Sequence, residues 1–165
     1  MNDRTPTYVI QKHDATRLHY DFRLEVGGVL VSWAVPKGPS LDPSDKRLAM
    51  MVEDHPMEWG SFEGVIPKGE YGAGGVIVWD RGTYGNLRDD ETMSDGLAKG
   101  RIRFSLDGGK LHGGWSLRHF PRGGENGWLL VKLDDEHARR GGDITAERPE
   151  SVDSGRTLEE LIASR

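Results

Sequence analysis

The sequence predicts a mainly β fold, a closed antiparallel β-barrel with one or two short helices. Glycine is abundant, with 23 among 165 residues, and apolar runs are short, which suits tight turns between strands better than a helical bundle. Several segments alternate apolar and polar side chains, as strands with one buried face do. Gly- and Pro-rich stretches separate these segments at regular spacing. The length suits one compact domain with its own core.

The first elements in the chain form a predicted hairpin series. Residues 1–7 are polar and should form a flexible N-terminal arm. A turn at Asp14–Arg17 should separate the first two strands. Gly27 and Gly28 should separate the second and third, because Gly-Gly between two alternating runs signals a hairpin. The three predicted strands are Tyr8–His13, His19–Val26 and Val29–Val35.

The middle of the chain continues with strands and loops. A Pro-rich loop around Lys37 leads into a strand at Lys46–His55, and a turn-rich connection then reaches a short apolar strand at Val76–Asp80. Residues Gly82–Thr92 read as a loop. Met93–Lys99 should form a short helix that Gly100 closes.

The C-terminal part completes the predicted barrel. Three further strands are expected at Arg101–Leu106, Lys110–His119 and Trp128–Leu133. The barrel domain should span residues 8–150, and after Asp134 the chain turns charged and irregular. Residues 151–165 should form a tail in which Thr157 caps a short helix.

Composition excludes several classes of protein. The chain has no cysteine, which rules out disulfides, thiolate metal sites and a cysteine nucleophile. No apolar stretch approaches the roughly 20 residues of a membrane span, and no leader is evident, so we expect a cytoplasmic protein without a membrane partner. The net charge of −5 argues against bulk electrostatic coating of nucleic acid. Any anion site must therefore come from a few cations that folding brings together.

The segment QKHDATRLHYDFRLE, residues 11–25, carries an unusual row of polar groups. On a strand, successive side chains point to opposite faces, so Tyr20, Phe22 and Leu24 should share the buried face. The other face then carries an imidazole, a guanidinium and two carboxylates, from His19, Asp21, Arg23 and Glu25. Solvated strand faces more often carry Lys, Glu, Thr and Ser.

Three residues on separate predicted strands could hold a divalent metal: His13, Asp21 and His55. Two imidazoles and a carboxylate suit Mn²⁺, Fe²⁺ or Zn²⁺ and leave positions open for water and substrate oxygen. A period of two in the strand of His55 puts it on one face with Arg47, Ala49, Met51 and Glu53. The alternative is structural, with His55 as a cap and His13 as a polar group on an edge strand.

Cations near these groups indicate an anionic substrate. Arg23 and Arg47 could each bind two phosphate oxygens through the planar guanidinium, and Lys37 and Gln11 lie near the same motifs. Metal together with paired arginines points to phosphate. Taken singly, arginines are more often solvated or salt-bridged, and we expect this of several among Arg17, Arg81, Arg88 and Arg103.

Most other prominent motifs are predicted to have structural roles. The tract GEYGAGG at residues 69–75 lacks the spacing of a phosphate-binding glycine loop and runs into a strand instead of a helix. Among the tryptophans, only Trp59 is a candidate for stacking on a base or sugar. The others should be core or rim residues: Trp33, Trp79, Trp115 and Trp128. His112, His119 and His137 have no comparable partners and are read as structural.

Several motifs in one order resemble the 3′-phosphoesterase domain of bacterial DNA ligase D and its stand-alone relatives. They are QKHDATRLHYDFRLE, SWAVPKGPSLDPSDKRLAMMVEDHP, FEGVIPKGEYGAGGVIVWDRG and WLLVK, and the resemblance spans about residues 8–149. It implies a β-barrel with a surface active site that uses a metal, with manganese favoured and zinc, cobalt or iron as alternatives. It also implies action on DNA 3′ ends or primer-template duplexes, beside a DNA ligase and polymerase, by a monomer associated with the nucleoid during repair.

The resemblance also implies roles for particular residues. The metal ligands would be His13, Asp21 and His55, from the motifs QKH, HYD and EDH. Catalytic contacts to phosphate would come from His19, Arg23, Arg47 and Lys37, with His19 also able to protonate the leaving 3′ oxygen. Substrate binding or support of the site would come from Gln11, Glu53, Trp59 and Arg81. Trp59 stands where relatives can carry a tyrosine, so a phenolic hydroxyl is missing there.

The family catalyses two steps, removal of a 3′-terminal ribonucleoside and then of the 3′-phosphate, leaving a 3′-hydroxyl. The core motifs of the second step are present. The first depends on polar residues in a longer segment before QKH, and only ten residues precede Gln11 here. Two other readings remain: a non-catalytic module that binds DNA 3′ ends, and a barrel metal oxygenase acting on small molecules.

Overall fold

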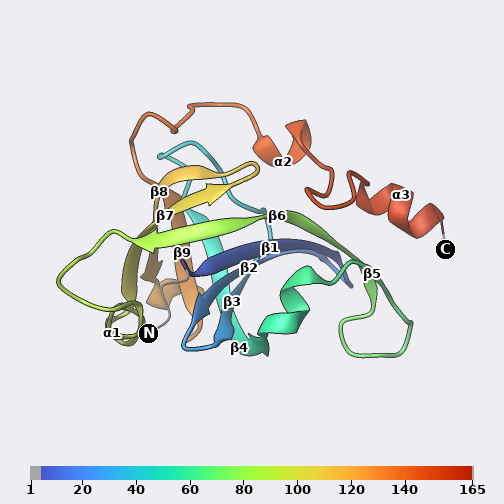
Figure 1. The fold of residues 1–165 in the computed structure, drawn as a ribbon, viewed down its shortest axis with the longest axis horizontal. Helices are drawn as coiled ribbons and strands as arrows, with labels where there is room; N and C mark the ends of the chain where they lie inside the picture. Colours follow the sequence, from blue (N-terminus) through green and yellow to red (C-terminus); the bar gives the residue numbers. More distant parts are fainter. Residues whose placement is uncertain (1–4, 165) are drawn as a thin grey trace.

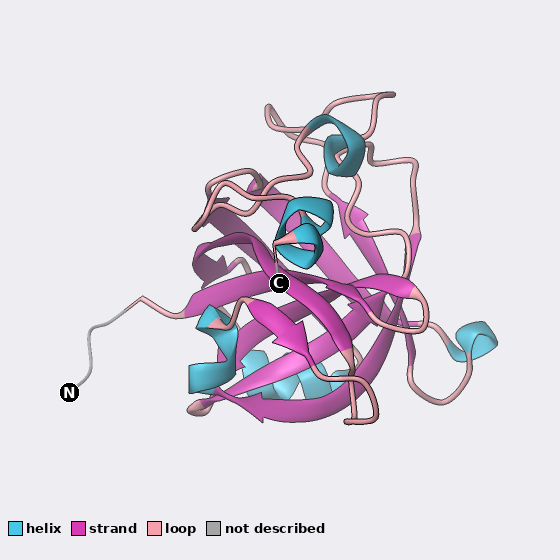
Figure 2. Cartoon of the chain, turned by 90° about the vertical axis from the view of Figure 1, so that its right-hand side faces the viewer, coloured by secondary structure: helices cyan, strands magenta, loops and turns pink. Residues whose placement is uncertain are grey.

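The structure, a computed structural model, describes residues 5–164. Its strands form one antiparallel sheet that wraps into a barrel, with the short helices outside it (Figures 1 and 2). The strands are β1 (Thr7–Asp14), β2 (Leu18–Val26), β3 (Val29–Val35), β4 (Arg47–Pro56), β5 (Gly64–Ile66), β6 (Gly74–Asn86), β7 (Arg101–Gly108), β8 (His112–His119) and β9 (Gly127–Lys132). The helices are α1 (Met93–Lys99), α2 (Ile144–Glu147) and α3 (Leu158–Ala163), with 3₁₀ turns η1 (Met57–Ser61) and η2 (Pro121–Gly123).

Pairing of β1 with both β2 and β6 closes the barrel. The ring runs β1-β2-β3-β4-β9-β8-β7-β6, and β5 pairs only with the first residues of β6. Closure leaves no free strand edge among the eight strands of the ring. The predicted closed antiparallel barrel is thus confirmed.

The barrel interior is filled by alternate residues of the strands. On β2, the predicted core face is confirmed, because Tyr20, Phe22 and Leu24 are all buried. The four tryptophans that were read as core residues are also buried: Trp33, Trp79, Trp115 and Trp128. Because one set of alternate side chains fills the core, the opposite set of β1 and β2 points outward, where the polar row of residues 11–25 lies.

Strand β6 is longer than the sequence indicates. It continues through Gly82 to Asn86, so the prediction of a loop at Gly82–Thr92 is wrong for its first five residues. Two glycines hid the strand, since glycine is a poor strand former. At Gly82 a Cβ atom would lie 2.1 Å from the Asp107 carbonyl oxygen, so the close approach of β7 requires glycine. Tyr84 is buried and donates a hydrogen bond to the Glu25 carbonyl oxygen (2.6 Å).

Strand β4 contains a bulge that the period of two does not anticipate. Leu30 pairs with His55 and Ser32 with Val52, so two β4 residues, Glu53 and Asp54, oppose one β3 residue. Before the bulge, Ala49 is fully buried and faces the core. The extra residue reverses the phase, and His55 points outward. The prediction that His55 shares a face with Arg47, Ala49 and Met51 is therefore wrong.

The terminal segments pack on the barrel. Of the predicted arm, residues 1–4 lie outside the described part of the chain, and Thr7 already belongs to β1. Thr157 caps α3 in a capping box with Glu160, as predicted, and Leu158 is buried. Helix α2 was not predicted; the Asp143 side chain caps it by accepting from the Thr145 amide (3.0 Å). The predicted tail thus contributes to the packing of the domain.

Candidate functional site

A cleft of about 1100 Å³ lies on the outer face of β1 to β4. The β1–β2 hairpin forms its floor. The loop between these strands borders it on one side, and the loop between β5 and β6 on the other. Most of the polar row of residues 11–25 meets this cleft, because the inward side chains of the same strands are committed to the core.

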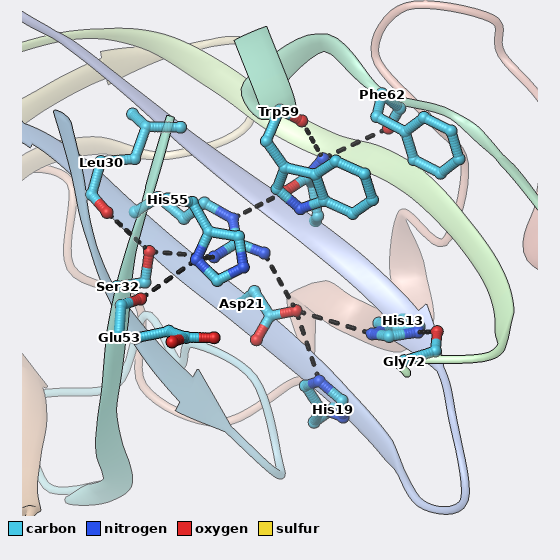
Figure 3. A network of polar contacts seen from close by, with 12 residues as sticks. His13, His19, Asp21, Leu30, Ser32, Glu53, His55, Trp59, Phe62 and Gly72 are labelled. Atoms are coloured by element: carbon cyan, nitrogen blue, oxygen red, sulfur yellow. Dashed lines mark hydrogen bonds and ion pairs between the residues drawn. The ribbon is translucent and has the colours of Figure 1, made fainter. Parts of the chain in front are cut away.

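Three potential metal ligands converge in the cleft: His13, His19 and Asp21. Their ligand atoms all lie within 4.8 Å of one another. The hairpin register explains the convergence, since His13 is directly opposite His19 on the paired strand, and Asp21 is two residues further along the same face. Asp21 Oδ2 lies 3.3 Å from His19 Nε2 and 3.8 Å from His13 Nδ1 (Figure 3). The group contains His19 where the sequence indicated His55.

Backbone carbonyls orient both imidazoles toward this centre. His13 Nε2 lies 2.7 Å from the Gly72 carbonyl oxygen, and His19 Nδ1 lies 3.0 Å from that of Arg17. A carbonyl oxygen can only accept, so the nitrogen beside it carries a hydrogen. The other nitrogen of each ring faces the Asp21 side. This is the arrangement in which outer hydrogen bonds orient histidine ligands.

Arg23 lies next to the three potential ligands, and several side chains fix the position of its guanidinium. Its Nη2 lies 3.4 Å from Asp21 Oδ2, its Nε donates to Gln11 Oε1 (2.7 Å), and its Nη1 donates to Ser32 Oγ (2.9 Å). The Arg23 side chain is only 3% exposed to solvent, yet Arg23 lines the cleft. Gln11 in turn donates to the Trp59 carbonyl oxygen (2.8 Å) and so ties η1 to the barrel.

His55 approaches Arg23 from β4 and is separate from the metal-ligand group. Its Nδ1 lies 3.2 Å from Arg23 Nη1 and 3.1 Å from the Glu53 carbonyl oxygen, and its ring packs at 6.3 Å from that of Trp59. Figure 3 shows His55 and His13 on either side of Asp21. The bulge in β4 places His55 here, with the Glu53 and Trp59 side chains lining the same cleft.

The charges around Asp21 favour the ionised form of its carboxylate. Burial alone would raise the pKa of Asp21, but the adjacent imidazoles of His13 and His19, with the charge of Arg23, hold that pKa well below its ordinary value. The hydrogen bond to Asp21 raises the pKa of His19. Burial, followed by the nearby Arg23, lowers the pKa of His55, which favours its neutral form. Burial also lowers the pKa of Arg23.

Four predicted site residues do not line the cleft. Gln11 is fully buried and reaches the site only through its hydrogen bond with Arg23. Arg47 shares the phase of the core-facing Ala49, and its Nη2 lies 4.0 Å from Asp45. Lys37 follows the end of β3 in an exposed turn. Arg81 borders a different cavity, and its Nε donates to Asp153 Oδ1 (2.6 Å).

Comparison with known proteins places the chain in a family. Residues 11–119 match the family model described as the DNA ligase D 3′-phosphoesterase domain. The chain belongs to this family.

Curated relatives agree with the family match. The chain is 58% identical over 154 residues to the multifunctional non-homologous end joining protein LigD of Pseudomonas aeruginosa, an alignment that covers 92% of this chain and 18% of that protein. It is 48% identical over 130 residues to the LigD of Mycobacterium tuberculosis H37Rv, with 79% of this chain and 16% of that protein covered. The chain therefore corresponds to less than a fifth of the length of these relatives.

The structure also adds residues to this phosphoesterase-family site that the sequence reading missed. The GEYGAGG tract, for which the sequence predicted no role in the site, supplies the Gly72 carbonyl that orients His13. Tyr71, next to it, is 94% exposed and lines the cleft, as does Arg17 on the opposite loop. The positive φ of Gly72 (75°) is the backbone feature behind this loop shape. Among residues 5–164, no helix has the length and apolar character to cross a membrane.

Proposed function

We propose that the chain is a divalent-metal-dependent 3′-phosphoesterase that hydrolyses a DNA 3′-phosphate and leaves a 3′-hydroxyl. One observation carries the proposal: a His-His-carboxylate group adjoins a buried arginine in an open cleft of a protein from the DNA ligase D 3′-phosphoesterase domain family. A metal-ligand group suits activation at phosphorus, and the adjoining guanidinium suits a phosphoryl group.

His13, His19 and Asp21 are the residues that would hold the metal. Two imidazole nitrogens that face Asp21 and one carboxylate kept ionised by its low pKa are a donor set for Mn²⁺, Zn²⁺, Co²⁺ or Fe²⁺. We propose manganese, as the family resemblance implies. When bound, such a metal supplies Lewis-acid polarisation of a phosphate oxygen and activation of water.

Arg23 and His55 would contact the phosphoryl group. Arg23 keeps its charge beside the ligands while Gln11 and Ser32 fix its orientation, so it offsets charge on the phosphoryl oxygens without reorganisation. His55 Nδ1 is occupied by Arg23 and by the Glu53 carbonyl oxygen, which leaves Nε2 as the ring nitrogen available to the phosphoryl group. In hydrolysis, water attacks phosphorus, the bond to the 3′ oxygen breaks, and that oxygen takes up a proton.

The wider role is inferred from relatives whose names describe non-homologous end joining. We infer that the chain prepares DNA 3′ ends for a ligase and a polymerase of that repair process, in the cytoplasm at the nucleoid. Removal of a 3′-terminal ribonucleoside is a second proposed activity of the same cleft. Lys37, Arg47 and Arg81 lie outside the cleft, so we assign them no catalytic role.

The deciding experiment compares two DNA primers, one ending in a 3′-phosphate and one in a single 3′-ribonucleotide, with Mn²⁺, Zn²⁺, Co²⁺ or a chelator present. We expect metal-dependent release of inorganic phosphate from the first. Tight binding of the 3′-phosphate end without turnover under every metal would favour the non-catalytic end-binding module instead. Iron-dependent oxygen uptake without end processing would favour the oxygenase.

Metal affinity should rise with pH. The hydrogen bond to Asp21 raises the pKa of His19 in the metal-free protein, so His19 retains its proton to a higher pH and the metal must displace it. We expect the dissociation constant for Mn²⁺ to fall between about pH 5.5 and pH 8 and then to level off. Titration calorimetry in buffers of different ionisation enthalpy would count the released protons. An affinity that does not change with pH would contradict histidine ligation.

Tyr71 should contribute to substrate binding instead of chemistry. An aromatic ring at 94% exposure on the cleft wall is suited to stack on the terminal base. We expect Tyr71→Ala to raise KM for a 3′-phosphate oligonucleotide roughly 5- to 100-fold with little change in kcat. Tyr71→Phe is the matched control and should retain the wild-type KM, because stacking needs only the ring. Equal KM values for Tyr71→Ala and wild type would remove Tyr71 from the binding surface.

A further inference from the structure

A concentration of cations lies on the barrel wall across from the cleft. Five of them line a hollow of about 170 Å³ and form the basic patch: Lys46, Arg88, Arg101, Arg103 and Arg118. The ring order places β8 across the barrel from β2, so the basic patch is separate from the site described above. No carboxylate lines this hollow within the described residues, although the whole chain has a net charge of −5.

The strand register forces like charges together in the basic patch. Arg101 on β7 is directly opposite Arg118 on β8, and Arg103 is directly opposite Ser116. These side chains face outward, because Ile102 and Leu117 between them are buried. Like charges directly opposite one another destabilise an antiparallel pair. The register therefore concentrates positive charge on this surface, and a bound anion would reduce the repulsion.

The protein neutralises only part of this charge. Glu91 forms ion pairs with Arg101 (2.6 Å) and Lys99 (2.9 Å) and a longer one with Arg88 (3.8 Å). The Nε of Arg88 is buried without a hydrogen-bond partner among the described residues. Three cations of the basic patch form no ion pair with any residue from 5 to 164: Lys46, Arg103 and Arg118.

We propose that the basic patch binds backbone phosphates of a nucleic-acid segment distinct from the 3′ end in the cleft. Four of the five cations are arginines, whose planar fork can bind two phosphate oxygens, and the Ser116 hydroxyl lies among them as a further donor. Arg, Lys and Ser are characteristic donors to nucleic-acid phosphates. Arg101 and Arg103 repeat along β7 at roughly 7 Å, so the cations form an array suited to a regular phosphate chain more than to one small anion.

The test uses a duplex closed by a hairpin loop at each end, so that no 3′ end is available to the cleft. Binding is measured by fluorescence anisotropy at several salt concentrations for wild type and Arg103→Gln/Arg118→Gln. Loss of two phosphate contacts should weaken binding and make the slope of log affinity against log salt shallower by about 2. The matched control, Arg139→Gln/Arg140→Gln, changes net charge equally at exposed arginines outside the patch and should keep the wild-type slope.

Two further measurements separate the outcomes. Thermal unfolding of Arg103→Gln/Arg118→Gln should show no loss of stability, since the change relieves repulsion. Release of phosphate from a short single-stranded 3′-phosphate oligonucleotide should be unchanged, so failure of this proposal and failure of the proposed function are distinguishable. Equal salt slopes for the two double variants would overturn the proposal. Equal binding of polyglutamate through the same arginines, or displacement of the duplex by inorganic phosphate at unchanged ionic strength, would overturn the assignment to nucleic acid.

Discussion

Replacing His19 with alanine should abolish Mn²⁺ binding and, with it, the release of phosphate from a DNA 3′-phosphate end. His19 Nε2 is one of three ligand atoms within 4.8 Å, and its ring is already oriented by the Arg17 carbonyl. Loss of even an outer partner of a ligand costs roughly 10- to 100-fold in metal affinity, so loss of a ligand should cost more than about 100-fold. Calorimetry with Mn²⁺ and a phosphate-release assay would measure both effects.

His55→Ala is the informative comparison, because the sequence indicated His55 as the third ligand. His55 lies against Arg23 instead, so its loss should leave Mn²⁺ affinity within a few fold of wild type while slowing phosphate release. His119→Ala, an exposed histidine on β8 across the barrel, should change neither property. Loss of Mn²⁺ binding in His55→Ala together with its retention in His19→Ala would restore His13, Asp21 and His55 as the metal ligands.

His19, and not His55, lies with His13 and Asp21 in the structure because of the hairpin register, which the sequence does not specify. Alternation correctly put His19, Asp21 and Arg23 on one outward face. The predicted turn at Asp14–Arg17 was one residue off, since β1 extends to Asp14 and β2 begins at Leu18. The observed register places His13 directly opposite His19. A shift of one residue moves such partners out of alignment, and no local signal in residues 14–18 determined it.

The bulge in β4 explains why Arg47 and His55 could not be placed correctly. A strict period of two assigned them to one face, but the extra residue at Glu53–Asp54 separates a core-facing half of the strand from an outward-facing end. Bulges depend on the partner strand, here on β3 opposite Val31, and so are not encoded in the alternation of one strand. The overall barrel was predictable because most strands keep their period. The placement of His55 was not, because this residue follows the break in the period of β4.

The Arg23→Met substitution should lower both the stability and the activity of the protein. It removes the donors to Gln11 Oε1 and Ser32 Oγ and leaves the carboxylate of Asp21 without its cation. Removing one partner of a buried charge pair typically costs about 3–5 kcal/mol of unfolding free energy. Urea unfolding in chelator would measure this, because a metal that binds the native state would mask the loss. Phosphate release at saturating Mn²⁺ should also fall.

Two companion variants separate charge from geometry. Arg23→Lys keeps a positive charge but not the fork that reaches Gln11, Ser32 and Asp21 together, so it should be intermediate in stability and still impaired in activity. In the Arg23→Met/Asp21→Asn double variant no buried carboxylate is left unpaired, so its loss of stability should be smaller than the sum of the two single losses. Arg103→Gln, an outward arginine with no ion-pair partner among residues 5–164, is the control and should unfold like wild type.

The pH dependence of unfolding provides a second, independent readout for Arg23. The folded-state pKa of Asp21 is lowered, so Asp21 stabilises the protein above its unfolded pKa of about 3.9, and this stability is lost as pH falls toward the folded value. Arg23 is one cause of that low pKa, so in Arg23→Met the folded pKa should move up toward the unfolded one. Stability should then depend less on pH between about pH 5 and pH 3 than in wild type. A variant with wild-type acid dependence and a loss below about 1 kcal/mol would show that Arg23 is not the electrostatic partner of Asp21.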